Sequence, residues 1–140
     1  MIAVESVDII TRHNLLTTPR CAQALRQGVE QGWRIGDLLR LVREMLSNAQ
    51  LLTTPEQREQ FFAEPEDTGD PRWDAMLAGC VEMIHLRNQW PAPAWTPGHA
   101  LDYFWWVNPG PAMQAYVFAR SPMSLHLRGV LIDPADLESV

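Results

Sequence analysis

The clearest periodic pattern of the chain lies in residues 35–52, where apolar side chains recur at steps of three and four residues. This spacing collects them on one face of a helix and predicts an amphipathic helix over residues 35–52. A similar pattern predicts a helix over residues 19–31 that ends near Gly32. Together the two helices would form an N-terminal helical hairpin within residues 15–52. The apolar positions of the second helix are Ile35, Leu38, Leu39, Val42, Met45, Leu46 and Ala49.

The pentad LLTTP occurs twice, at residues 15–19 and 51–55, and precedes a helical pattern each time. Thr18 and Thr54 are the predicted N-caps, each followed by a proline at the first helical position, where its missing N–H costs nothing. Thr54 and Gln57 also fit a capping box. Beyond the pentads the segments match only at scattered positions, which indicates two similar helix starts rather than a repeat.

Three further regions complete the predicted architecture. A short third helix ends near Ala63, and after the acidic run EPEDTGD a helix capped by Asp70 is expected over residues 71–89. Prolines interrupt residues 90–100, after which we expect short helices at residues 97–106 and 111–119. A β-rich run at residues 130–132 precedes a one-turn helix that Asp133 would cap. The buried stripe predicted for the helix over residues 71–89 is Trp73, Met76, Leu77, Cys80, Val81 and Ile84.

These elements predict a mostly α fold: one compact domain spanning residues 1–140, with about five to seven helices and at most a short strand near the C-terminus. A length of 140 residues is typical of a single domain. Residues 63–140 form its aromatic and acidic C-terminal module. No window approaches the roughly 20 apolar residues of a membrane span, and the N-terminus has no signal-peptide pattern. We therefore expect a cytoplasmic protein without a membrane partner.

Charge is distributed unevenly along the chain, whose net charge is -6. Residues 1–50 hold six arginines against five acidic residues, whereas residues 51–140 hold five arginines against twelve. Such an acidic surface repels a nucleic-acid backbone and attracts a basic protein. The absence of lysine from the sequence is most simply explained by a GC-rich coding bias, since the arginines are scattered.

The sequence contains none of the familiar catalytic or cofactor motifs. Glu82 and His85 form a single E-x-x-H pair, but a di-iron site requires two such pairs and further carboxylates, so a solvated helix face is expected and no metal or cofactor is predicted. Cys21 and Cys80 are expected to be buried structural thiols. The interpretation is a protein without enzymatic activity, with an enzyme of unfamiliar type as an alternative.

A DNA-binding regulator is a second alternative. Residues 19–52 can be read as a helix-turn-helix with Arg34, Arg40 and Arg43 on the second helix. However, recognition modules are normally basic, and this segment has a net charge of only +2. A helical hairpin with a core role explains the same pattern.

The run YFWWVNPGPAMQAY, residues 103–116, is dense in aromatic side chains. Trp105 and Trp106 cannot point in the same direction in either a helix or a strand. One of them is therefore expected to be exposed or covered by a partner, because tryptophan is favoured at interfaces as well as in cores. Trp73, Phe104 and residues 130–132 are predicted to belong to the core.

Several short motifs after residue 63 resemble a family of small bacterial proteins from high-GC genomes. The run AEPEDTGDPRWDAMLA at residues 63–78 is similar to its pattern AEPxxTGDxRWDALLA, and PAPAW, the pair WW and RGVLID with a following DL match the remainder. The resemblance covers roughly residues 63–140. It implies an antitoxin-like role, because such proteins are often encoded beside a nucleotidyltransferase-like toxin of the abortive-infection type, and it brings no catalytic residues.

The partner-binding candidates follow from the aromatic and charged positions of this region. The acidic residues could instead form a solvated loop without a binding role. Arg128 could instead end a helix or lie in a loop, paired with Asp133 or Asp136. The predicted partner is a protein, namely the toxin, with DNA as the less favoured choice. The candidates are Trp95, Trp105, Trp106, Arg128, Glu64, Glu66, Asp67 and Asp70.

Overall fold

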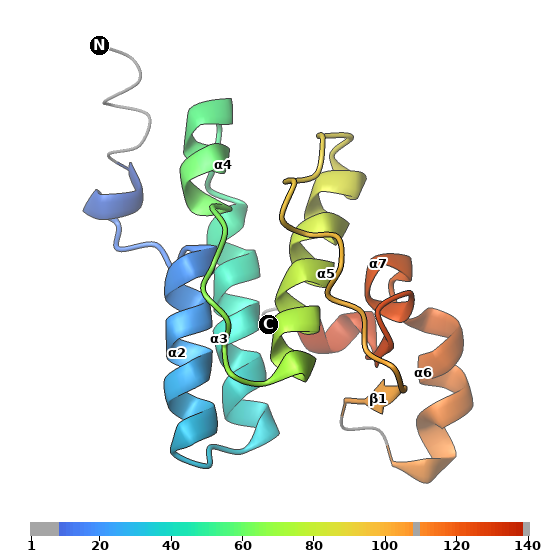
Figure 1. Ribbon diagram of the computed structural model, residues 1–140. Helices are drawn as coiled ribbons and strands as arrows, with labels where there is room; N and C mark the ends of the chain where they lie inside the picture. The colour runs from blue at the N-terminus through green and yellow to red at the C-terminus, as the bar shows by residue number, and fades with distance from the viewer. Residues whose placement is uncertain (1–8, 108–109, 139–140) are drawn as a thin grey trace.

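The computed structural model describes residues 9–107 and 110–138. It confirms a mostly α fold with a very short strand pair near the C-terminus. Figure 1 shows the helices in order. They are α2 (Thr18–Glu30), α3 (Ile35–Ala49), α4 (Pro55–Phe61), α5 (Pro71–Arg87), α6 (Gln114–Arg120) and α7 (Met123–His126), with 3-10 turns η1 (Pro111–Met113) and η2 (Pro134–Leu137) and strands β1 (Trp105–Trp106) and β2 (Val130–Leu131).

The predicted N-terminal hairpin is present as α2 and α3, which lie side by side and run in opposite directions (Figure 1). The apolar stripe of α3 is buried from Leu38 to Ala49, as its spacing predicts. Ile35, in the first turn, is 36% exposed and extends beyond the packed region. In the described part of the chain, no helix has the length and apolar character needed to cross a membrane.

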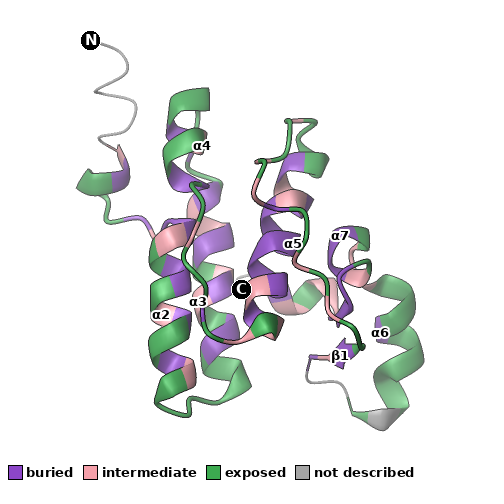
Figure 2. Ribbon diagram, viewed as in Figure 1, coloured by how far each residue is buried: buried purple, intermediate pink, exposed green. Residues whose placement is uncertain are grey.

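Helix α5 lies at the centre of the fold and contacts α2, α7 and β2. Residues 75–81 are all buried, so this helix is covered on every side rather than along one stripe (Figure 2). Gly79 permits the close approach of α7, since a Cβ there would lie 2.5 Å from Cδ2 of Leu125. Trp73 and residues 130–132 belong to the core, as predicted.

The two LLTTP pentads begin their helices differently. Thr54 caps α4 in a full capping box with Gln57, as predicted. The prediction for Thr18 is wrong, because Thr17 is the N-cap of α2 and accepts a hydrogen bond from the Arg20 N–H at 3.4 Å. Thr18 is instead buried in the first turn, with its hydroxyl 3.5 Å from the sulfur of Met45. Packing against α3 thus shifts the helix start by one residue.

The predicted helix over residues 97–106 is wrong. This segment is irregular, with a turn at residues 97–98 and a bend at residues 102–103, and its end forms β1, which pairs in parallel with β2. The N–H groups of Leu101, Trp105 and Val107 donate to the carbonyls of residues 128, 129 and 131 at 2.9, 2.7 and 2.9 Å, respectively. Pairing with a segment far along the chain therefore overrides the local helical preference.

Candidate protein-interaction surface

Strand β1 separates the two neighbouring tryptophans, because successive side chains of a strand point to opposite faces. Trp105 is 6% exposed and packs edge-on against Trp73, with ring centroids 5.1 Å apart. Trp106 is half-buried on the opposite face. Phe104, one position before Trp105, is 53% exposed, so its predicted core position is wrong. Strand alternation explains why Phe104 and Trp106 share the outer face.

Four aromatic rings from three elements meet on this outer face. Phe118 of α6 lies 5.8 Å from Phe104 and 4.6 Å from His126 of α7, measured between ring centroids, and 6.4 Å from Trp106. His126 also lies 6.1 Å from Phe104. We call Phe104, Trp106, Phe118 and His126 the α6 aromatic surface. Its rings contact one another, and Phe104 and Phe118 are exposed while Trp106 and His126 are half-buried.

Helix α6 contributes Phe118 to this surface and is itself poorly covered. Val117 is its one buried residue within the described side chains (Figure 2). Its C-terminal end is fixed by Ser121, whose hydroxyl accepts a hydrogen bond from the Ile132 N–H at 2.9 Å. Single exposed apolar residues are common on protein surfaces, but several that lie together often mark an interaction site. The exposed apolar neighbours are Tyr103, Met113, Tyr116, Met123 and Leu127.

The acidic loop before α5 lies beside Trp95. Glu64, Glu66 and Asp67 are exposed and line a shallow hollow of about 30 Å³ together with Trp95 and His99. The indole of Trp95 is fixed there by a 3.0 Å hydrogen bond from its N–H to the carbonyl of Phe62. The structure thus brings four of the predicted partner-binding residues together. Residues 91–104 connect this hollow to the α6 aromatic surface.

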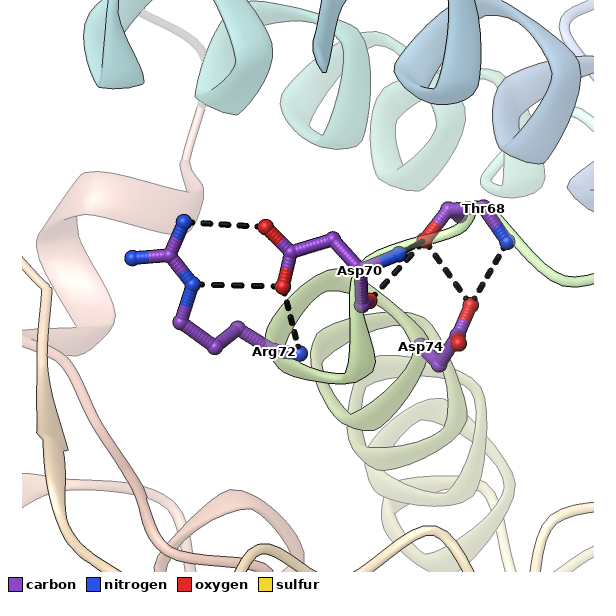
Figure 3. Close-up of polar contacts among 4 residues, drawn as sticks. All are labelled: Thr68, Asp70, Arg72 and Asp74. Carbon is purple, nitrogen blue, oxygen red and sulfur yellow. Dashed lines mark hydrogen bonds and ion pairs between the residues drawn. The ribbon is translucent and has the colours of Figure 1, made fainter. Parts of the chain in front are cut away.

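Asp70 has a structural role at the start of α5 (Figure 3). Its carboxylate accepts the Arg72 backbone N–H at 3.0 Å and both Nε and Nη2 of the same arginine, which lowers the pKa of Asp70. The hydroxyl and N–H of Thr68 both lie within 2.9 Å of Oδ1 of Asp74. The TGDxRWD motif is therefore a helix-capping network, and it leaves Asp70 engaged within the chain.

Arg128, a predicted partner-binding residue, is buried, and the alternative pairing with Asp133 or Asp136 is wrong as well. Its Nη1 and Nη2 donate to the two carboxylate oxygens of Glu82 at 3.1 and 3.0 Å. The same guanidinium donates to the carbonyls of residues 124 and 96 at 2.8 and 2.9 Å. It therefore joins α5, α7 and the loop of residues 91–104. The long-range position of Glu82 cannot be read from the sequence.

The predicted solvated face at Glu82 and His85 is also wrong. Glu82 is held by Arg128, and His85 is buried with its Nδ1 2.7 Å from the Val81 carbonyl. No cluster of three metal-binding side chains occurs among the described residues. Cys21 and Cys80 are buried free thiols, as predicted, and burial raises the pKa of Cys80 to about 12.

The α2–α3 pair does not have the character of a DNA-recognition unit. The helices of a helix-turn-helix cross at about 90–120°, whereas α2 and α3 lie alongside each other in opposite directions (Figure 1). On α3 the exposed Arg40 is accompanied by exposed Asp37 and Glu44. Arg43 is drawn toward η2, where it donates to the Asp136 carbonyl at 3.3 Å. The exposed Arg34 and Arg40 are thus interspersed with exposed acidic side chains.

Comparison of the chain with protein-family models, curated proteins and solved structures gives no match. The α6 aromatic surface is the feature that sequence reasoning located only in part. It identified Trp106 but missed Phe104, Phe118 and His126 as surface residues. The sequence did contain one indication of exposed apolar residues here. Residues 113–118 carry more apolar side chains than one face of a short helix can bury.

Proposed function

We propose that the protein is a non-enzymatic protein-interaction module that acts as the antitoxin of a bacterial toxin–antitoxin pair. In this proposal it binds a nucleotidyltransferase-like toxin and masks it. The α6 aromatic surface carries the argument, because it joins the exposed Phe104 and Phe118 with the half-buried Trp106 and His126 in one cluster. Aromatic side chains are enriched in protein interfaces and supply much of their binding energy.

The charge of the molecule supports a basic partner. The net charge is -6, and Glu64, Glu66 and Asp67 remain exposed beside Trp95. A nucleotide-binding cleft carries positive charge to hold phosphates, so attraction over distance would guide the two proteins together. The aromatic surface would then supply the close contact. The choice of a nucleotidyltransferase-like toxin as the partner rests on the motif resemblance of residues 63–140.

The direct test is co-expression with the protein encoded by the adjacent gene. We expect a stable complex on gel filtration and relief of that protein's toxicity. Phe118→Asp, which places a charge in the centre of the aromatic surface, should weaken the complex at least about a hundredfold, the loss expected for an interface hot spot. Leu51→Asp is the matched control, since Leu51 is an exposed apolar residue outside this surface.

The acidic loop is tested separately through the rate of association. The triple change E64Q, E66Q and D67N should slow association at low salt and leave dissociation nearly unchanged. Absence of both a complex and protection from toxicity would contradict the antitoxin proposal. Equal binding by Phe118→Asp and Leu51→Asp would show that the α6 aromatic surface is not the interface.

A further inference from the structure

A second site lies between α4, the C-terminal half of α5 and the start of the loop after α5. It is a cavity of about 400 Å³, within the size range of small-molecule sites. Its walls are mainly aromatic rings and prolines, with few polar groups. The rings are those of Phe62, His85, Trp90 and Trp95, and the charged side chains are Arg58 and Glu59.

Arg58 is the cation of this cavity, and it is already held in place. Its guanidinium carbon lies 4.1 Å from the ring centroid of Trp90. This stacking fixes the planar group while its N–H donors remain free. The Arg58 backbone N–H donates to the Thr54 carbonyl at 3.1 Å, but among the described residues its guanidinium has no hydrogen-bond or ion-pair partner, and the neighbouring Glu59 does not pair with it. The donors are thus open to an external anion.

His85 provides the second polar group. Its ring contacts Trp90 at 5.8 Å and Phe62 at 4.7 Å between centroids. Nδ1 must carry a proton to donate to the Val81 carbonyl at 2.7 Å, so the neutral ring has its lone pair on Nε2. Nε2 has no hydrogen-bond partner in the described part of the chain. The imidazole and the guanidinium of Arg58 therefore pack against the same indole, each with an unused polar edge.

We propose that this cavity binds a small monocarboxylate carried on a planar ring, with the carboxylate shared by Arg58 and His85 and the ring held by the aromatic walls. One arginine and a nearby Glu59 suit a single negative charge better than a polyphosphate. Aromatic walls favour a flat ring through stacking and edge contacts. On binding, Nε2 takes up a proton and donates to the carboxylate, while Nδ1 continues to donate to Val81.

The test uses the full-length protein and indole-3-acetate as the probe, with isothermal titration calorimetry and NMR of the His85 ring. Binding should move the ring signals of His85 and be about tenfold tighter at pH 5.5 than at pH 8, since a neighbouring opposite charge shifts a pKa by about one unit or more. Tryptophol, which keeps the ring without the charge, and acetate, which keeps the charge without the ring, should each bind much more weakly.

Variants identify the anion-binding group. Arg58→Gln should weaken binding of indole-3-acetate at least about tenfold, because this is the affinity that a hydrogen bond to a charged group typically contributes. Arg26→Gln, a change at an exposed arginine far along the chain, should leave it unchanged. The proposal is overturned if neither indole-3-acetate nor benzoate binds at millimolar concentration, if tryptophol binds as well as indole-3-acetate, or if AMP binds more tightly than either carboxylate. Equal affinity at both pH values would contradict the role of His85.

Discussion

The buried pair of Arg128 and Glu82 allows a quantitative prediction about stability. Replacement of Arg128 by methionine should lower the free energy of unfolding by about 3–5 kcal/mol, as is found when one partner of a buried ion pair is removed. The side chain of Arg128 is 8% exposed and that of Glu82 is 23% exposed. The change leaves Glu82 without its cation and deprives the carbonyls of Thr96 and Ser124 of a donor each.

The magnitude follows from these four hydrogen bonds. Each hydrogen bond to a charged group contributes about 1.5–3 kcal/mol net, but Glu82 regains water in the variant because it is partly exposed. The loss should therefore fall below the simple sum. Methionine retains part of the apolar stem of arginine, so little of the effect comes from lost packing.

Urea unfolding monitored by circular dichroism provides the assay. The midpoint should fall by about 1 M or more, given typical urea dependences for a small domain. A cycle with Glu82→Gln should give a coupling energy of about 1–3 kcal/mol. Arg26→Met removes the exposed pair with Glu30, whose side chains are 54% and 65% exposed, and should cost less than about 0.5 kcal/mol. A loss below about 1 kcal/mol for Arg128→Met would refute the reasoning.

The same pair predicts how stability changes in acid. The hydrogen bonds from Arg128 lower the pKa of Glu82 below 4.5 in the folded state. As the pH falls, Glu82 is therefore protonated in the unfolded chain before it is protonated in the folded protein. The stability that the pair contributes above pH 4.5 is lost as the pH falls through the pKa that Glu82 has in the folded protein. The difference in unfolding free energy between the wild type and Arg128→Met should accordingly narrow between pH 6 and pH 3.

Four other predictions concern Gly79, Gly36, His85 and Cys80. Gly79→Ala should cost about 1–3 kcal/mol through overlap with Leu125, whereas Gly36→Ala, which meets nothing within 4 Å, should stabilise α3 by about 0.4–1 kcal/mol in the same urea assay. Burial lowers the pKa of His85 from its ordinary value, so this histidine should make the unfolding free energy decrease as the pH falls below 6.5, and His85→Asn should make that slope smaller between pH 7 and pH 5. Cys80 should not react with a thiol reagent at pH 8 until urea unfolds the chain, and labelling of the native protein would contradict its burial.

The helices were predictable wherever local chemistry decides the structure. The α3 stripe, the cap of α4 at Thr54 and the start of α5 at Asp70 all follow from residues within a few positions of one another. The helix predicted over residues 97–106 failed because the backbone there bonds to residues 128–131, and such pairing leaves no local pattern. The same pairing turned Phe104 outward by strand alternation.

The candidate surface was also predictable only in part. That Trp105 and Trp106 must diverge follows from backbone geometry alone, and the structure confirms that one is buried while the other faces outward. Which of them faces outward depends on the register with Val130 and Leu131. The sequence by itself determined the mostly α fold, the caps of α4 and α5 and the acidic loop, because these depend on near neighbours. Only tertiary structure decided that Arg128 is internal and that α6 brings Phe118 to Trp106, because both result from contacts between distant segments.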